Sequence, residues 1–424
     1  MKNSEVPNRP TVLDLFAGCG GLSVGFEAAG FDIACAVEID PVHCLVHHYN
    51  FPYSATICCD INILDKELIY RNISKKGFKE IDVIVGGPPC QGFSNIGKRQ
   101  LDDKRNQLVY QYLRIIKELK PKYFIFENVP GIASGKHKIF LKELISEFDR
   151  IGYLITNPYQ VLEASAFGVA QNRKRLILLG SRSDQNPIDY PTATHSNDYL
   201  NENLFGDSTK PIIGAEEVIG SLEKCGVNIG KDEPFSLIDH KGIRDTEEYS
   251  FRNCHIRTVD NKIHNHMGSK HSRNSIERFE STEQGKTELI SRFFKLHPLK
   301  PCNTLRAGTN SDHGAHTAPR PIHYKYPRCI TVREAARLHS FPDWFHFHKT
   351  IWHGFREIGN AVAPLLAKSL GTEIIKNLDY TYDRLSVRTL PKQDETILSF
   401  SMIEACNYWG VERSIEPRKR LHLR

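Results

Sequence analysis

The chain of 424 residues is predicted to fold as an α/β protein with a mostly parallel, doubly wound sheet and a second, smaller and irregular domain. Three observations predict this. Short apolar runs alternate with helical segments through about the first 180 residues, polar or reactive residues follow the ends of these runs, and the composition turns polar after Ser181. Near-continuous apolar strands separated by helices are typical of parallel sheets that are covered on both faces.

The first strand, Thr11–Phe16, ends in a glycine turn that leads into a helix over Leu22–Ala29. Later apolar runs are short and bounded by turn residues, as buried strands are. They are Phe31–Val37, Ala55–Cys58, Ile81–Val85, Tyr123–Phe126 and Leu176–Leu179. Ligands of doubly wound sheets bind outside the carboxyl ends of the strands. We therefore expect the site at this edge, where the sequence places Gly18, Glu38, Asp60, Cys90 and Glu127.

The rest of the chain is predicted to divide into further parts. Residues 185–300 are polar and weakly periodic, whereas Thr331 and Glu334 form a capping-box pattern at the start of a helix within 330–340. Helices are also expected over Gly359–Gly371 and, on the protein surface, over Phe400–Gly410. The predicted domains are residues 1–184 with about 345–378, then about 185–344, and a C-terminal extension over 379–424.

Composition excludes several classes of protein. No apolar run approaches the ~20 residues that span a bilayer, and residues 1–10 lack the apolar core of a signal peptide. The 11 cysteines are odd in number and form no CxxC pair, which favours a reducing cytoplasm and no metal site. The net charge of the chain is +6, but residues 241–424 alone carry +10. This excess of positive charge suggests a polyanionic partner, and the alternative is an ordinary solvated surface.

The glycine turn predicts a nucleotide-type cofactor. Phe16-x-Gly18-x-Gly20 follows a strand and opens a helix, so the backbone can approach a ligand closely. Glu38 closes the next strand, where a carboxylate typically accepts hydrogen bonds from ribose hydroxyls. The alternative is that Glu38 or Asp40 caps a helix.

The segment around Cys90 predicts a nucleophile. Pro88 and Pro89 hold the chain stiff and extended just before the thiol, although most cysteines are buried and inert. Glu127 at the next strand end could donate a proton, or could bond the backbone. Alternation would place Arg173 and Arg175 on one face to hold an anionic group, although such a run is more often a solvated charge cluster.

Five sequence blocks in fixed order resemble the C5-cytosine DNA methyltransferase family of the bacterial restriction–modification type. The blocks are Asp14–Leu22, Gly87–Ser94, Glu127–Val129, Gln171–Arg175 and Gly359–Val362, and Thr331–Leu338 with Phe341–Asp343 matches a further one. In the last block Glu357 replaces the usual glutamine and Ala363 the usual proline, which is a mild departure. The resemblance implies a Rossmann-like, S-adenosylmethionine-dependent methyltransferase domain with a target-recognition domain.

The resemblance also implies residue roles. Cys90 would attack C6 of a flipped cytosine, Glu127 would bond N3 and the exocyclic amine, Arg175 would support O2, and Arg173 would lie near the active-site phosphate or loop. Methyl transfer from S-adenosyl-L-methionine to C5 would follow, without a metal. The implied cofactor residues are Phe16, Gly18, Gly20, Glu38, Ile39, Asp60, Ile61, Asn360 and Val362.

The implied partner is double-stranded DNA. Gln91, Ser94, Lys98 and Arg99 belong to a segment that resembles the family's mobile DNA-closing loop, and residues 185–300 would hold the target-recognition region. The basic residues proposed there are Arg252, Arg257 and Arg273. A monomer in the bacterial cytoplasm, at the nucleoid and with a cognate restriction endonuclease encoded nearby, is expected. The alternatives are a transfer RNA cytosine methyltransferase, a catalytically silent DNA-binding homologue and, more weakly, a small-molecule methyltransferase.

Overall fold

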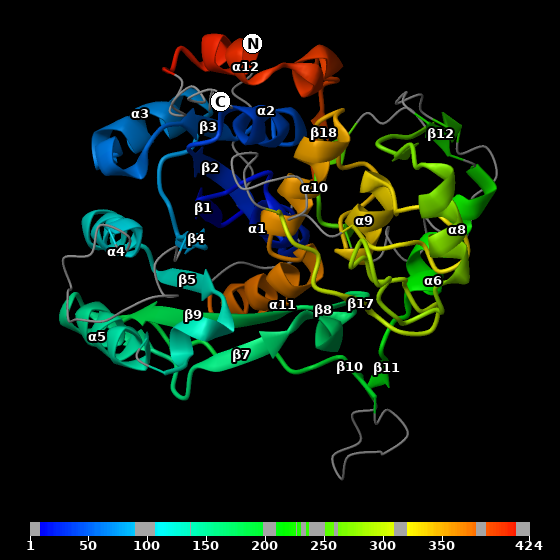
Figure 1. Ribbon diagram of the computed structural model, residues 1–424. Coiled ribbons are helices and arrows are strands. Elements are labelled where there is room, and N and C mark those ends of the chain that lie inside the picture. The colour runs from blue at the N-terminus through cyan, green and yellow to red at the C-terminus, as the bar shows by residue number, and fades with distance from the viewer. Residues whose placement is uncertain are drawn as a thin grey trace, which may run out of the picture.

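The computed structural model is built around one large sheet, with an irregular region beside it (Figure 1). No helix among the described residues is both long and apolar enough to cross a membrane. The structure describes residues 9–89, 107–135, 137–197, 209–225, 227–229, 235–236, 251–257, 262–308, 320–378 and 387–412.

The sheet has eight strands in the order β3-β2-β1-β4-β5-β9-β6, and β7 also pairs with β9. The parallel strands are β1 (Thr11–Leu15), β2 (Asp32–Glu38), β3 (Ala55–Cys58), β4 (Val83–Gly86) and β5 (Tyr123–Asn128). The antiparallel strands are β6 (Tyr153–Ile155), β7 (Gln160–Glu163) and β9 (Lys174–Arg182). The mostly parallel sheet is confirmed, with an antiparallel edge that the apolar pattern did not reveal.

Both faces of the sheet are buried, because successive strand residues enter different apolar clusters. Val12 and Val83 lie in one cluster, whereas Leu13 and Ile84 lie in the other. The first cluster also receives α1 (Gly21–Ala29), α2 (Pro41–Asn50) and α11 (Pro364–Ile375), and the second receives α3 (Lys66–Lys75), α4 (Gln107–Leu119) and α5 (His137–Arg150). Helices on both faces give the doubly wound architecture that the sequence predicts.

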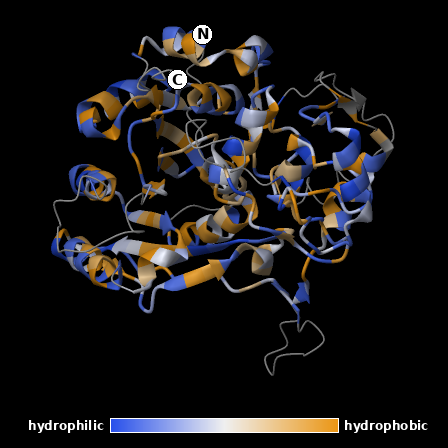
Figure 2. Ribbon diagram, in the orientation of Figure 1, coloured by the Kyte–Doolittle hydropathy of each residue, from blue (hydrophilic) through white to orange (hydrophobic). Residues whose placement is uncertain are grey.

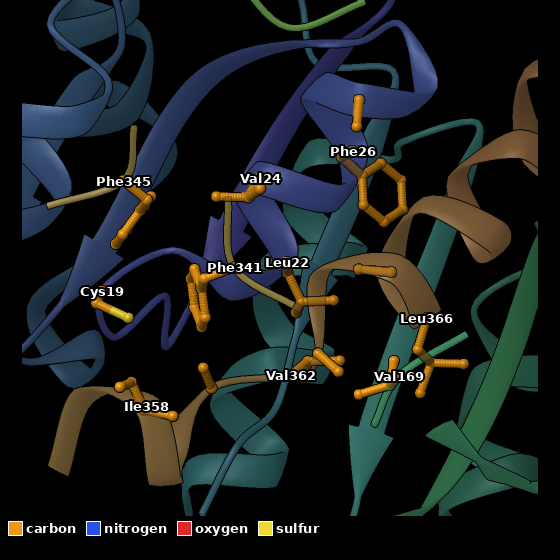
Figure 3. Packing of buried hydrophobic residues seen from close by; sticks show 14 of the residues in the cluster. Cys19, Leu22, Val24, Phe26, Val169, Phe341, Phe345, Ile358, Val362 and Leu366 are labelled. Carbon is orange, nitrogen blue, oxygen red and sulfur yellow. The ribbon is translucent and has the colours of Figure 1, made fainter. Parts of the chain in front are cut away.

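Glycines bring α1 and α11 into close contact. A Cβ atom added at Gly25 would lie 2.4 Å from the Cβ of Ala367, and one at Gly371 would lie 2.8 Å from the Cβ of Ala29. Such distances are below any normal contact, so both positions need glycine. Figure 3 shows side chains of α1 and α11 in the same cluster, which includes Leu22 and Leu366.

The second region has little helix among its described residues, as expected, and it is the more hydrophilic side of the molecule in Figure 2. Within 185–300 the described helices are α6 (Ala215–Ile219), the 3₁₀ helix η5 (Gly220–Cys225) and α8 (Arg273–Ser281). The remaining two-residue strands, most of them here, are β8 (Gln171–Asn172), β10 (His195–Ser196), β11 (Lys210–Pro211), β12 (Asn228–Ile229), β13 (Phe235–Ser236), β14 (Ile256–Arg257), β15 (Lys262–Ile263), β16 (Met267–Gly268), β17 (Cys302–Asn303) and β18 (Thr389–Leu390).

The helix α9 (Val332–Leu338) begins as the sequence predicts. Thr331 accepts a hydrogen bond from the Glu334 N–H, and the Glu334 carboxylate accepts one from the Thr331 N–H. Leu338 and Phe341 pack in the same apolar cluster as the sheet, so packing shows no break near residue 344. The three-part domain division therefore stays a prediction.

The predicted single helix over Gly359–Gly371 is wrong. The chain forms α10 (Ile351–Asn360), turns at Ala361–Ala363 and begins α11 at Pro364. Proline lacks the N–H that a helix interior requires and forces the preceding residue into an extended conformation, as the φ of −63° and ψ of 125° at Ala363 show.

The C-terminal segment is folded against α2 and against the strand β14. β18 pairs with β14, the 3₁₀ helix η8 (Glu395–Ser399) follows, and α12 (Met402–Trp409) ends the described chain. The helix predicted over Phe400–Gly410 is confirmed: Ser401 and Glu404 form its capping box, and Gly410 takes the left-handed conformation that ends it.

We expect replacement of Glu334 by glutamine to cost about 3 kcal/mol of stability at pH 7. Burial would raise the pKa of this carboxyl, but hydrogen bonds from Arg328 and its charge, with His323 beyond, lower the pKa to about 2. Since the folded pKa lies below the usual 4.5, the stabilisation is complete above pH ~4.5 and declines as the pH falls toward 2.

Urea unfolding of both proteins at pH 7 and pH 4 measures this, and the gap should be about 1 kcal/mol smaller at pH 4. Glu277→Gln, on an exposed carboxylate, is the control. A gap that does not change with pH would contradict the ionic role of Glu334.

Candidate active site

The carboxyl ends of the parallel strands bring the predicted residues to one edge of the sheet. β2 ends at Glu38, β3 ends two residues before Asp60, and Glu127 is the penultimate residue of β5. The segment that follows β4 reaches Pro89, and Cys90 lies outside the described residues. Gln91, Ser94, Lys98 and Arg99 also lie outside them, so their roles stay predictions.

The turn after β1 is held in an uncommon backbone conformation. The φ angles of Phe16, Gly18 and Gly20 are 59°, 56° and 106°, all in the left-handed region. A Cβ atom at Gly20 would lie 2.9 Å from both His47 and Phe51, whereas one at Gly18 would meet no atom within 4 Å. Phe16 has no such freedom as a non-glycine residue, and strain of this kind clusters at functional sites. The turn therefore presents its backbone to open space beside Gly18.

The Glu38 carboxylate organises this turn. Its Oε2 accepts a hydrogen bond from the Gly18 N–H, and its Oε1 accepts bonds from the N–H groups of Ile39 and Asp40, all at 2.9 Å. The helix cap is Asp40, which accepts from the first turn of α2. Glu38 therefore does not cap the helix. A carboxylate has about four acceptor positions, so Oε2 keeps one for a ligand hydroxyl.

Three further predicted residues on this side differ in accessibility. Asp60 is partly exposed, and its Oδ1 accepts hydrogen bonds from the Asn62 backbone and side chain, each at 2.9 Å. Ile61 is buried in the apolar cluster behind it, whereas Ile39 is 50% exposed. Of the predicted cofactor residues beside Glu38 and Asp60, Ile39 therefore offers exposed apolar surface and Ile61 does not.

Glu127 and Arg175 form an ion pair at the end of β5. Arg175 Nε lies 2.6 Å from Glu127 Oε1, and both side chains are largely buried. A Cβ atom at Gly87 would lie 2.6 Å from Glu127 Oε2, so only glycine lets the carboxylate lie against this backbone. Asn128 donates a hydrogen bond to the Pro88 carbonyl at 3.1 Å, which ties the segment before Cys90 to β5. The sequence motif contained Gly87 and Asn128, but their roles depend on contacts between two strands.

Arg173 and Arg175 have different partners, and the prediction that the two guanidiniums together hold an anion is wrong. Arg173 lies between β8 and β9, separated from Arg175 by the exposed Lys174. It is buried and donates hydrogen bonds of 2.9 Å to the carbonyls of Leu305, Gly359 and Ala361. Burial, followed by repulsion from Arg175, lowers its pKa to about 9.

Two further residues that sequence reasoning missed support the same junction. Gln171 accepts a hydrogen bond from the Leu305 N–H at 2.9 Å and contacts His339 Nδ1 at 2.8 Å. His339 Nε2 lies 3.0 Å from the Ala361 carbonyl. Burial holds the pKa of His339 well below its usual value, so the ring is neutral. Gln171 belongs to the block Gln171–Arg175, but its role depends on Leu305 and His339, which lie more than 100 positions away.

The late segment packs directly on the glycine turn. A Cβ atom at Gly21 would lie 2.3 Å from the Val362 carbonyl oxygen, and Figure 3 shows Val362 beside Leu22 of α1. Val362 is buried, and Asn360 is exposed at the end of α10. Residues 340 positions apart thus form one wall of the site.

Arg257 does not read DNA, contrary to the sequence prediction. Its guanidinium pairs with buried Glu27 at 2.8 Å, donates to the Asn50 carbonyl at 3.0 Å and stacks 3.8 Å from the Trp344 ring centroid. Arg252 and Arg273 are exposed, and Arg273 pairs with Glu277 at 3.0 Å. Their DNA contacts stay predictions.

The model of the C-5 cytosine-specific DNA methylase family matches residues 10–376. The chain belongs to this family. Family membership makes it a DNA (cytosine-5) methyltransferase, and the curated relatives place it in the type II class.

Relatives match over nearly their whole length. The type II methyltransferase M.XorII of Xanthomonas oryzae pv. oryzae is 45% identical over 97% of this chain and 95% of its own. M.NgoPII of Neisseria gonorrhoeae is 33% identical over 89% of this chain and 100% of its own. The crystal structure of a candidate prophage-encoded DNA modification methyltransferase from E. coli superposes with a TM-score of 0.68, at 32% identity over 88% of this chain and 100% of that one.

We expect Gly87→Ala to lower kcat for DNA methylation about 100-fold, because the new Cβ displaces the Glu127 carboxylate by an ångström or more. Steady-state kinetics measure this. Gly131→Ala, where an added Cβ meets no atom within 4 Å, is the matched control and should match wild type. If the two variants had equal activity, the position of the Glu127 carboxylate would not matter for the reaction, and its catalytic role would be contradicted.

We expect Arg257→Ala to lower the free energy of unfolding by about 3–5 kcal/mol, because it leaves the Glu27 carboxylate buried without its partner. Chemical unfolding measures this loss, and mapping of methylated sites should show the wild-type sequence preference. A changed preference with unchanged stability would restore Arg257 as a DNA-reading residue.

Proposed function

We propose that the protein transfers the methyl group of S-adenosyl-L-methionine to C5 of a cytosine flipped out of DNA, with Cys90 as the nucleophile. The observation that carries this proposal is the Glu127–Arg175 pair, 2.6 Å apart, held against Gly87 three residues before Cys90. One edge of the sheet thus brings together a carboxylate, a guanidinium and the backbone segment that leads to Cys90.

The residues beside the glycine turn fit the cofactor. The open backbone at Gly18, the remaining acceptor position of Glu38 and the exposed side chain of Ile39 suit an amino-acid moiety, a ribose hydroxyl and an adenine ring. Asp60 keeps Oδ2 for the adenine amine. When bound, S-adenosyl-L-methionine supplies an electrophilic methyl group. Phe16, Gly20, Asn360 and Val362 would line the same wall.

The chain's own residues would activate the cytosine. The Cys90 thiolate adds to C6, which breaks the aromaticity of the ring and places electron density on C5. Glu127 would bond N3 and the exocyclic amine, while Arg175 would bond O2 and offset the charge that develops there. C5 would take the methyl group, with S-adenosyl-L-homocysteine as the leaving product. C5 would then lose its proton to a base or water, and the electron pair of that bond would expel the Cys90 thiolate from C6. Flipping the cytosine out of the duplex costs a few kcal/mol, which DNA contacts must offset.

Arg173 has a different part in this proposal. Because its two terminal nitrogens donate to three backbone carbonyls and its side chain is buried, we infer that it positions the 359–361 segment and contacts no substrate. We infer that methylation protects host DNA against a cognate endonuclease and that one monomer suffices for one strand. The residues that read the target sequence would lie within 185–300.

The test uses the purified protein, labelled S-adenosyl-L-methionine and unmethylated DNA, followed by base-resolution mapping of 5-methylcytosine. We expect label on cytosine C5 within one short sequence and none with Cys90→Ser, because serine is a far weaker nucleophile. Gly131→Ala is the control variant.

Three outcomes would contradict the proposal. Label on transfer RNA and not on DNA would favour the RNA methyltransferase. DNA binding without any transfer would favour the silent homologue. Transfer by Cys90→Ser at the wild-type rate would remove the covalent step.

A further inference from the structure

The C-terminal strap, defined here as residues 387–412, is not explained by the reaction. It lies beyond residue 376, where the family match ends. The match to the Xanthomonas relative leaves only 3% of the chain uncovered, fewer residues than the strap contains, so that match reaches into it. Figure 1 shows the strap passing along α2 from β18 to α12.

The first anchor of the strap is at the start of β2. The Arg388 guanidinium pairs with the buried carboxylate of Asp32. The Arg388 carbonyl accepts a hydrogen bond from the Ile256 N–H at 2.8 Å, and the Arg388 backbone N–H donates one to His255 Nδ1 at 3.2 Å. The strap is thus fixed at the amino end of the strand that carries Glu38 at its other end.

The second anchor is on the segment that leads into α10. The Leu398 carbonyl accepts a hydrogen bond from the Lys349 N–H at 2.8 Å, and the Phe400 carbonyl accepts one from His348 Nε2 at 3.1 Å. The His348 N–H donates to Glu357 Oε2 at 3.1 Å. Glu357 lies one turn before Asn360, so the strap reaches one wall of the cofactor site through two contacts.

The third anchor is on the first turn of α2. Trp409 Nε1 donates a hydrogen bond to the Pro41 carbonyl at 3.1 Å, and its ring meets His48 edge-on with the centroids 5.7 Å apart. Ala405 and Cys406 form the buried face of α12. Pro41 follows Asp40 directly, and the N–H groups of Ile39 and Asp40 hold the Glu38 carboxylate.

We propose that the strap fixes the first turn of α2 and thereby sets the affinity for S-adenosyl-L-methionine, with Trp409 as its positioning residue. A shift of Pro41 moves the two N–H groups that orient Glu38. It also moves Ile39, which is exposed next to Glu38. This inference rests on the proposed function in taking the Glu38 edge as the cofactor site.

The test compares the full-length variants Trp409→Phe and Ile403→Ala with wild type. Phenylalanine keeps an aromatic ring against His48 but removes the hydrogen bond to Pro41, whereas Ile403 is a 60% exposed residue of the same helix. We expect Trp409→Phe to raise the Kd for S-adenosyl-L-methionine about three- to tenfold, the worth of one hydrogen bond. The KM for DNA and the kcat at saturating cofactor should stay within about twofold of wild type, and Ile403→Ala should match wild type throughout.

Thermal unfolding of each ligand-free variant checks that the chain is folded. An unchanged Kd in a folded Trp409→Phe protein would overturn the inference, and so would equal losses in cofactor affinity, DNA affinity and kcat. Failure of the proposed function is distinguishable, because wild type itself would then neither bind S-adenosyl-L-methionine nor transfer a methyl group.

Discussion

The buried guanidinium of Arg173 is the contact on which the assembly of the site depends. It joins the junction of β8 and β9 to the carbonyls of Leu305, Gly359 and Ala361, and so holds the segment before α11 against the glycine turn. Three carbonyl acceptors replace water around a charge that would otherwise be costly to bury. Even with its pKa lowered to about 9, the guanidinium is charged at neutral pH. Lysine could not serve all three carbonyls, because it lacks the planar fork of donors.

Buried charge also explains why residues 251–257 of the second region behave as core. Glu27 forms an ion pair with Arg257 and accepts a hydrogen bond from the Tyr53 hydroxyl at 2.8 Å. Burial alone would raise the pKa of the Glu27 carboxyl, but these interactions outweigh it and the pKa is lowered. Asp32 likewise pairs with Arg9, His255 and Arg388. The Glu27–Arg257 and Asp32–His255 pairs fasten residues 251–257 to α1 and β2. A base-reading side chain must leave its donors free for DNA, so Arg257 and His255 serve attachment, whereas the exposed Arg252 stays a candidate reader.

Much of the fold could be predicted because its signals are local. The strand ends at Glu38 and Glu127 follow from apolar runs of a few residues, and the α9 cap from two residues three positions apart. Pro364 is also a local signal, and it predicts the break between α10 and α11. The single helix was predicted instead because the residues around the proline are rich in alanine, which favours helix. By contrast, the roles of Arg173 and Arg257 depend on partners 132 to 230 positions away, and in sequence both look like ordinary surface or ligand-binding arginines. Pattern can identify a charged residue, but only the folded chain shows whether its partner is solvent, substrate or backbone.

The antiparallel direction of β9 decides the chemistry of the site. The sequence places Arg175 at the beginning of its strand, and in a parallel strand it would lie at the amino edge, far from Glu127. Because β9 runs against β5, with Glu127 opposite Ile177 and Asn128 opposite Leu176, the first residues of β9 reach the carboxyl edge instead. The reversal thus brings a guanidinium from the start of one strand to a carboxylate at the end of its neighbour. The hairpin partner β7, paired through Leu162 with Arg175, holds the backbone of that arginine on its other side. A cation fixed by two neighbouring strands is already placed before a base arrives, which is what electrostatic stabilisation of a developing charge requires.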